Sequence, residues 1–232
     1  MSIKRRQFLT GAAGAVAAAS TVFSPMTIAR NKKYRLGMVT SWPSSIDTLF
    51  GTAEYIGRAI EYATDGDVEV EVFAAGEQVG GLEVYDSVSS GAFAMGHTAS
   101  YYYIGQDPTH AFFTSMPFGL TGQQQNAWIE EGGGGDLWNE LNARSNMVAF
   151  LAGNTGGQTG GWFNKEINSP DDLKGLKMRF PGVGGQVMAR AGVNIQNLPG
   201  GQVYFALERG VIDAADWVSP YDDEILQLHK AA

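Results

Sequence analysis

The chain of 232 residues contains no cysteine, which excludes disulfide bonds, thiol catalysis and metal sites built on thiolates. Histidine is also scarce. Only His97, His110 and His229 are present, and the first two lie in apolar stretches of sequence. There is no Gly-x-Ser-x-Gly sequence, which marks the nucleophile of one large class of hydrolases. The sequence therefore offers little for nucleophilic catalysis.

Basic residues are outnumbered, since 16 Lys and Arg face 24 Asp and Glu and give a formal net charge of −8. An acidic surface repels phosphate backbones and anionic lipids, which argues against nucleic-acid or membrane-surface partners. An anionic ligand would have to be drawn in by a local positive site.

Long hydrophobic runs are missing, and the stretch 11–23 near the N-terminus is only weakly apolar and interrupted by glycine. It is too short to span a bilayer as a stable helix. Lys4, Arg5 and Arg6 precede it, so residues 1–29 are predicted to be an export signal, and the paired arginines before Phe8 indicate the twin-arginine type. An ordinary secretory signal is the alternative. Either signal predicts export, and the periplasm is the expected location.

Glycine is abundant, with 31 residues between periodic apolar segments, and predicts many short elements. Strands are expected at 35–40, 68–72, 92–95, 147–152, 161–167, 177–180, 193–198 and 211–217. Helices are expected after the Trp42-Pro43-Ser44-Ser45 turn as far as Thr64, and at 82–89, 183–191 and 203–209, with 123–144 helical at both ends and broken by four glycines. Such alternation predicts an α/β fold with mainly parallel sheets.

One pattern occurs twice. Gly80-Gly81 and Gly200-Gly201 each precede a tyrosine, and Gly91 and Gly210 each follow that tyrosine by six residues. Each block reads as a glycine turn, a short helix, a glycine stop and an apolar strand. Two lobes built on one plan would produce this repeat, as would chance, because glycine is common at helix ends.

Four ordered motifs carry a family resemblance: the run from Gly153 to Phe163 (GNTGGQTGGWF), Lys177 to Gly182 (KMRFPG), Leu198 to Gly201 (LPGG) and Gly210 to Val218 (GVIDAADWV). With them the chain resembles the extracytoplasmic receptors of tripartite ATP-independent periplasmic (TRAP) transporters, and most closely the branch that binds 2-oxo acids and related monocarboxylates. The resemblance extends from about residue 33 to the last residue.

The resemblance implies a two-lobed Venus-flytrap fold with a ligand cleft between the lobes. Residues 30–150 are expected to form lobe I, and 151–232 to begin lobe II and cross back toward lobe I. Family members continue beyond the last residue of this chain, so the fold is expected to be incomplete at the C-terminus. The implied function is capture of a small 2-oxo or 2-hydroxy monocarboxylate for delivery to membrane permease subunits, without an organic cofactor and without enzymatic activity. A homodimer is left open.

Arg179 is the first candidate for the ligand site. A guanidinium presents parallel N–H donors that match a carboxylate, and Arg179 stands at the end of a predicted strand, where open α/β sheets hold ligands. A strand-end arginine by itself is usually a solvated surface residue. The resemblance favours the functional interpretation, because the family's carboxylate-binding arginine lies in this motif.

A cation site is implied by the same resemblance. Gln158, the carboxylate of Asp216 and the backbone carbonyl of Trp217 would supply oxygens to Na⁺ or Ca²⁺ bridging ligand and protein, with Gln158 also reaching the ligand. Family members often carry glutamate where Asp216 stands, so coordination through water or a different metal is an alternative. The side chain of Trp217 is expected to pack on the ligand.

The opposite wall of the cleft is expected to be aromatic. Tyr101, Tyr102, Tyr103 and Trp42 are the candidates, because an aromatic ring packs on the apolar part of a ligand and a phenol donates to its oxygen. Tyr101 is chosen first, although the sequence does not show which of the three tyrosines faces the ligand.

The main alternative is an exported nucleotide- or cofactor-dependent oxidoreductase, suggested by Gly182-Val183-Gly184-Gly185 between a strand and a helix. Val187 occupies the position where the dinucleotide-binding pattern needs a small residue, which weakens this interpretation. A sensor domain of the same fold that feeds a signalling partner is a third possibility.

Overall fold

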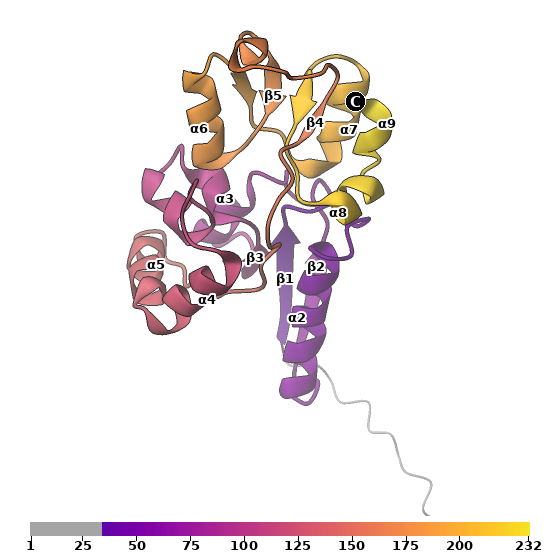
Figure 1. Cartoon of the computed structure of the whole chain (residues 1–232). Coiled ribbons are helices and arrows are strands. Elements are labelled where there is room, and N and C mark those ends of the chain that lie inside the picture. The colour runs from indigo at the N-terminus through magenta and orange to yellow at the C-terminus, as the bar shows by residue number, and fades with distance from the viewer. Residues whose placement is uncertain (1–33) are drawn as a thin grey trace, which may run out of the picture. The chain divides into compact units, whose positions relative to one another are not determined.

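The computed structural model describes residues 34–232, all of which belong to one compact unit spanning 32–232 (Figure 1). The predicted export signal, residues 1–29, lies outside the described residues. The N-terminal elements are β1 (Tyr34–Thr40), α2 (Phe50–Ala63), β2 (Val68–Phe73), α3 (Val84–Ser89), β3 (Met95–His97), the 3₁₀ helices η1 (Ser100–Tyr103) and η2 (Pro108–Phe113), α4 (Gly122–Glu131) and α5 (Gly134–Ala143). They are followed by β4 (Trp162–Phe163), η3 (Pro170–Leu173), β5 (Lys177–Arg179), α6 (Gly182–Arg190), β6 (Asn194–Gln196), α7 (Gly200–Glu208), β7 (Ala214–Ala215), α8 (Pro220–Ile225) and α9 (Leu228–Ala231).

The first sheet has the strand order β2-β1-β3, and both pairings are parallel. α2 connects β1 to β2 and packs on β2, where a Cβ on Gly57 would come within 3.3 Å of Val72. The alternating valines of β2, half-buried along the strand, give this helix its contact surface. The predicted β-α-β order of this region is confirmed.

The second sheet has the order β4-β7-β5-β6. β5 is parallel to both β6 and β7, whereas β4 runs antiparallel to β7. In the register of the sheet, Arg179 lies opposite Gln196 on one side and Ala215 on the other. The apolar core beside it gathers residues of α7, β7 and α9, including Val203, Leu207 and Leu228. This sheet places Arg179 at the carboxyl ends of two parallel strands.

The first sheet precedes residue 150 and the second follows it, but the proposed lobe boundary itself stays a prediction. Both copies of the glycine pattern form a helix that ends at a glycine with a left-handed backbone, Gly91 at φ 77° and Gly210 at φ 66°. A short strand follows each of them, β3 and β7 respectively. Within residues 34–232, no helix combines the length and apolar character needed to cross a bilayer.

The start of the first helix was predicted wrongly. The helix begins at Phe50, and Leu49 caps it without a side-chain hydrogen bond. The preceding residues form a turn instead, in which the N–H of Ile46 donates to the Pro43 carbonyl at 3.2 Å. Ile46 is fully buried in the apolar core beside α7, so tertiary packing rather than capping by Ser44 or Ser45 decides the geometry here.

The buried strand expected at 147–152 is absent, since this segment has no helix or strand. Val148 and Phe150 are 71% and 79% exposed. Ala149 is held by a side chain in place of a partner strand, because its N–H donates to Oδ1 of Asn139 at 2.7 Å and its carbonyl accepts from Nδ2 at 3.4 Å. The expected strands at 161–167, 193–198 and 211–217 exist in shortened form, and the one expected at 92–95 lies at Met95–His97.

Candidate ligand-binding site

Arg179 is the best-anchored cation of the described chain. Its side chain is 1% exposed and donates from Nη1 to the Asp216 carbonyl (2.6 Å), from Nε to the Leu198 carbonyl (3.2 Å) and from Nη2 to the Tyr102 hydroxyl (3.3 Å). Its guanidinium carbon lies 4.7 Å from the centre of the Trp217 ring. Among residues 34–232 it is the only buried lysine or arginine. A buried guanidinium with this many partners is fixed in position before any ligand arrives.

The strand order explains why these groups meet. β5 ends at Arg179 and is parallel to β7, and the N–H of Asp216 donates to the Arg179 carbonyl at 3.0 Å just beyond the paired residues. Neighbouring parallel strands present their carboxyl ends at the same edge of a sheet. Tyr102 arrives from η1, which belongs to the part of the chain before residue 150. Arg179 therefore joins residues from both parts of the chain.

Asp216 is a buried carboxylate whose charge is only partly compensated. It is 4% exposed, and its Oδ2 lies 3.8 Å from Nη1 of Arg179. Burial raises the pKa of Asp216 to about 7, although the Arg179 charge lowers it, and the neighbouring charge of Asp223 raises it further. Asp222 and Asp223 are buried as well, so the described chain buries three carboxylates and one guanidinium, of which only Asp216 is paired with Arg179. An additional cation beside Asp216 would relieve this imbalance.

Gln158 brings an amide to the same place. Its Nε2 donates to the Trp217 carbonyl at 2.8 Å. The amide therefore lies beside the backbone of Trp217, the residue directly after Asp216 in the sequence. The three groups offer a carboxylate, a carbonyl and an amide oxygen, which are the ligand types preferred by hard cations. Within residues 34–232 no cluster of three His, Asp or Glu could hold a metal. These residues fit a hard cation only if the Trp217 carbonyl is one of the ligands. The Gln158 amide must also rotate so that its oxygen, in place of its nitrogen, faces the cation.

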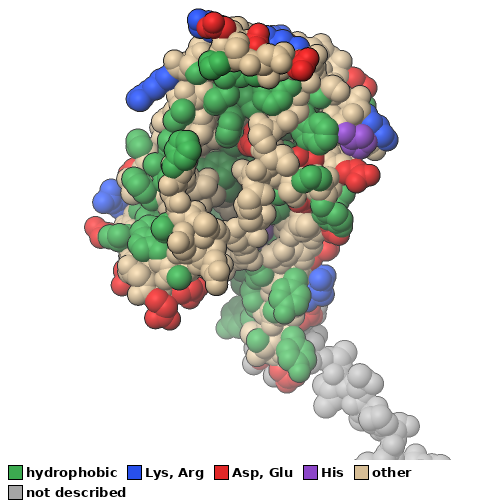
Figure 2. All heavy atoms as spheres, viewed as in Figure 1, with side chains coloured by type: hydrophobic (Ala, Val, Ile, Leu, Met, Phe, Trp, Pro, Cys, Tyr) green, Lys and Arg blue, Asp and Glu red, His purple; other side chains and the backbone are tan. Residues whose placement is uncertain are grey.

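Two cavities adjoin this cluster, with volumes of about 670 and 370 Å³. Tyr101 and Gln158 line both of them, Trp217 lines the larger, and Asp216 lines the smaller. In Figure 2 the surface is hollowed near its centre, with hydrophobic side chains around the hollow. Arg179 lines neither of these two cavities and lies behind the residues that do.

The three consecutive tyrosines play different parts. Tyr101 faces both cavities, and Tyr102 lines the larger one while accepting from Arg179. Tyr103 is 3% exposed, bonds to the Thr98 hydroxyl at 2.8 Å, and lines neither cavity. Trp42 lines the larger cavity. The structure thus places Tyr101, Tyr102 and Trp42 beside the cavities and Tyr103 in the core.

Comparison with known families decides the relationship. The family described as bacterial extracellular solute-binding protein, family 7, matches residues 38–232. The chain belongs to this family. Its members are solute-binding proteins, which agrees with the predicted absence of enzymatic activity and gives no support to the oxidoreductase alternative.

Relatives of this family 7 chain include a monocarboxylate 2-oxoacid-binding periplasmic protein of Nostoc sp. (strain PCC 7120). The two are 52% identical over 237 residues, which cover 99% of this chain and 64% of that relative. A TRAP transporter solute-binding protein of Bordetella bronchiseptica RB50, with calcium and picolinate in one site of a mixed-occupancy dimer, matches with a TM-score of 0.85 and 44% identity. The match covers 87% of this chain and 60% of the Bordetella protein.

A third relative, from Pseudoalteromonas atlantica and with bound sodium and pyruvate, gives a TM-score of 0.83 at 41% identity, covering 87% of this chain and 61% of that one. The predicted two-lobed α/β binding-protein fold is confirmed by these matches. The chain spans less than two thirds of the length of these three relatives.

Two polar groups beside the larger cavity were not predicted from the sequence. The indole nitrogen of Trp217 is buried without a hydrogen-bond partner in the described chain, so its N–H is a free donor. His97 lines the larger cavity, which its place in an apolar stretch of sequence did not indicate. Trp42 holds the His97 ring in place, because its indole Nε1 donates to Nδ1 of His97 at 2.6 Å although the two residues are 55 positions apart in the sequence. Sequence spacing does not reveal such a contact.

Proposed function

We propose that this chain is the ligand-capturing part of a periplasmic solute-binding protein that takes up a small 2-oxo or 2-hydroxy monocarboxylate and delivers it to a TRAP-type membrane permease. The names of the Nostoc relative and of the pyruvate-bound structure support this ligand class. The observation that carries the proposal is the position of Arg179. It is the one buried cation of residues 34–232, held between Tyr102 on one side and Asp216 and Trp217 on the other.

The guanidinium retains capacity for a ligand. Of its five N–H bonds, three are used by the contacts described above, which leaves one on each terminal nitrogen. The contact to the Tyr102 hydroxyl is the longest of the three and the only one to a side chain, because the other two go to backbone carbonyls. A carboxylate is a stronger acceptor than a phenol, so it would replace Tyr102 and pair with both terminal nitrogens.

Opening of the cleft gives the ligand its route. Leu198, Asp216 and Trp217 all lie in the chain after residue 150, whereas Tyr102 precedes it. Separation of the two lobes would break only the Tyr102 contact and would leave the other three contacts of Arg179 in place. Closure around the bound acid then buries it, and the free energy of ligand binding drives the closure.

A bound Na⁺ or Ca²⁺ would add a positive charge between Asp216 and the ligand carboxylate, as the cations of the matched structures support. In this chain Asp216, the Trp217 carbonyl and Gln158 would hold it. Burial already disfavours the ionised form of Asp216, so this carboxyl group has the most to gain from a nearby cation. Tyr101, which faces both cavities, would pack against the ligand.

The remaining parts of the proposal concern location and partners. Residues 1–29 would direct the chain to the periplasm as a twin-arginine-type export signal, residues 30–150 would form lobe I, and 151–232 would begin lobe II. The permease subunits would recognise the closed form. Assembly as a homodimer is supported by the dimer of the Bordetella relative.

Calorimetry on the purified chain tests the proposal, with pyruvate, lactate and larger 2-oxo acids, each with and without Na⁺ or Ca²⁺. We expect Arg179→Lys to weaken binding at least tenfold, because an ammonium cannot form the paired contacts of a guanidinium. Arg190→Ala, at an exposed arginine of α6, is the control and should bind like the parent. Circular dichroism would establish that both variants fold. Equal affinity of the folded Arg179→Lys variant and the parent would remove the anchor and the proposal with it.

A further inference from the structure

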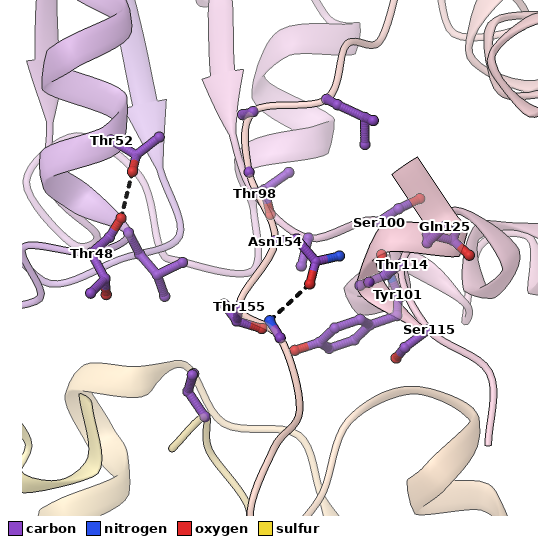
Figure 3. A pocket seen from close by; sticks show the side chains of 18 of the residues that line it. Thr48, Thr52, Thr98, Ser100, Tyr101, Thr114, Ser115, Gln125, Asn154 and Thr155 are labelled. Carbon is purple, nitrogen blue, oxygen red and sulfur yellow. Dashed lines mark hydrogen bonds between the residues drawn. The ribbon is translucent and has the colours of Figure 1, made fainter. Parts of the chain in front are cut away.

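The larger cavity has more room and a different chemistry than a three-carbon acid requires. Its volume of about 670 Å³ is typical of pockets for much larger ligands. Hydroxyl and amide side chains face it from several segments, among them Thr98, Ser100, Ser115, Asn154 and Thr155 (Figure 3). It is lined by no lysine or arginine among the described residues, and Asp222 is its one charged side chain. Apolar side chains line it as well, among them Leu49, Phe113 and Leu151, so the cavity suits an uncharged group that combines hydroxyls with apolar surface.

His97 contributes the most constrained polar group of this cavity. It is the last residue of β3, opposite Thr40 of β1, and the N–H of Ser41 donates to its carbonyl at 3.1 Å. Its Nδ1 lies 2.6 Å from the indole Nε1 of Trp42. An indole nitrogen can only donate, so Nδ1 must accept and the ring proton must be on Nε2. The contact with Trp42 thus selects one tautomer of His97.

The other ring nitrogen is available to a ligand. Nε2 has no hydrogen-bond partner among residues 34–232, and the ring lines the cavity. Burial lowers the pKa of His97 to about 4, so the side chain is uncharged near neutral pH. A protonated ring would also place a second N–H against the indole N–H, which the short contact does not permit. His97 therefore presents a fixed, neutral N–H donor.

His97 stands at a distance from the carboxylate anchor. The path between them runs from His97 to Trp42, with ring centres 6.0 Å apart, then to Tyr102 at 6.1 Å, and from its hydroxyl to Arg179. Two aromatic side chains thus separate the histidine from the guanidinium. No direct contact joins His97 and Arg179 among the described residues, so an acid held by Arg179 would reach His97 with an atom beyond its carboxylate.

We propose that His97 is a specificity-determining residue whose Nε2–H donates to an uncharged oxygen far along the ligand chain, so that the site takes 2-oxo monocarboxylates with a hydroxylated tail. This inference rests on the proposed function and names the substrate class more closely. The Ser115 and Thr155 hydroxyls, which make no hydrogen bond within the described chain, can pair with such a tail, whereas the Thr98 and Ser100 hydroxyls are already bonded to Tyr103 and His110. Asp222 and the lack of a lysine or arginine among the described lining residues disfavour a second carboxylate.

Two acids of equal chain length distinguish recognition of the hydroxylated tail from binding of the 2-oxo acid group alone. 2-Keto-3-deoxygluconate and 2-oxohexanoate both have six carbons and a 2-oxo group, but only the first has hydroxyls on its tail. We expect the parent chain to bind the hydroxylated acid more tightly. His97→Phe should weaken that binding about tenfold, the cost of one buried hydrogen bond, and leave 2-oxohexanoate and pyruvate unchanged.

His97→Gln is the conservative variant, because its amide can accept from Trp42 and still donate into the cavity, and it should bind within about threefold of the parent. His229→Gln is the matched control, because His229 is an exposed histidine of α9 that lines neither cavity. This control should leave the ratio of the two affinities as in the parent.

The ¹⁵N resonances of His97 supply a measurement that is independent of affinity. We expect a protonated Nε2 and an unprotonated Nδ1 in the free chain, and a shift of the Nε2–H signal only with the hydroxylated acid. Equal weakening of all three acids by His97→Phe, or an Nδ1–H tautomer, would overturn the inference and leave the proposed function intact. Loss of every acid by the parent chain would instead overturn both.

Discussion

The only partly compensated carboxyl group of Asp216 makes the stability of the cation-free chain depend on pH in a definite direction. Its pKa of about 7 in the folded state is raised from the ordinary 3.8, mainly by burial. The folded chain therefore binds a proton that the unfolded chain releases between these values. The resulting stabilisation is complete below pH 3.8 and is lost as the pH rises through about 7.

The magnitude follows from the same two values. At about 1.4 kcal/mol for each pKa unit, the rise from 3.8 to about 7 corresponds to at most about 4 kcal/mol of unfolding free energy. Asp216→Asn has nearly the same shape and does not titrate. We expect the unfolding free energy of the parent to fall relative to that of Asp216→Asn by about 2–4 kcal/mol between pH 5 and pH 8.

Urea unfolding at several pH values measures this difference, in choline buffer with a chelator so that neither Na⁺ nor Ca²⁺ is present. Comparison of the two proteins cancels the titration of all other groups. Addition of Na⁺ or Ca²⁺ at pH 8 should then stabilise the parent and leave Asp216→Asn unaffected. Parallel pH profiles for the two proteins would refute the reasoning, because they would show that burial of Asp216 carries no electrostatic cost.

Three further substitutions test the packing around the site. Asp223→Ala should lower the unfolding free energy by about 3–5 kcal/mol in urea melts. This fully buried carboxylate accepts hydrogen bonds from an indole, a hydroxyl and a backbone N–H, and all three donors would be left unpaired. A loss below about 1 kcal/mol would contradict this. Gly200→Ala places a Cβ against the ring of Trp217 and should lower the unfolding free energy by about 1–3 kcal/mol. It should also weaken pyruvate binding in calorimetry, whereas unchanged affinity would show that the position of the ring is not critical. Tyr102→Phe removes the acceptor for Nη2 of Arg179 and should destabilise the free chain by about 1–2 kcal/mol, with a smaller loss when the ligand is bound; equal losses in both states would argue against replacement of the phenol by a carboxylate.

The sequence predicts the parts of this fold that depend on local signals. Alternating valines and glutamates identify β2, and the four glycines from Gly132 mark the break between α4 and α5, where Gly133 has φ 84°. The position of Arg179 at a strand end follows from the alternation of Leu176 and Met178 with Lys177 before it and from Pro181 after it. Each of these signals involves residues close together in the chain, where periodicity and backbone preference are decisive.

What the sequence does not predict depends on contacts between distant residues. Phe150 lies in an apolar run, yet it is exposed because Asn139 holds the neighbouring backbone and no strand pairs with it. Tyr101 and Tyr103 have the same chemistry, and only the turn of η1 decides that one lines the cavities and the other enters the core. The tautomer of His97 likewise depends on an indole 55 residues away.

The three anchors of Arg179 also bear on how the chain folds. They lie 19, 37 and 77 residues away in sequence, so none of these hydrogen bonds can form before long stretches of backbone have been brought together. Contacts of such high sequence separation slow folding, and until they form the guanidinium remains hydrated. We therefore expect binding activity to be regained more slowly during refolding than the helical signal, because helices form from local contacts.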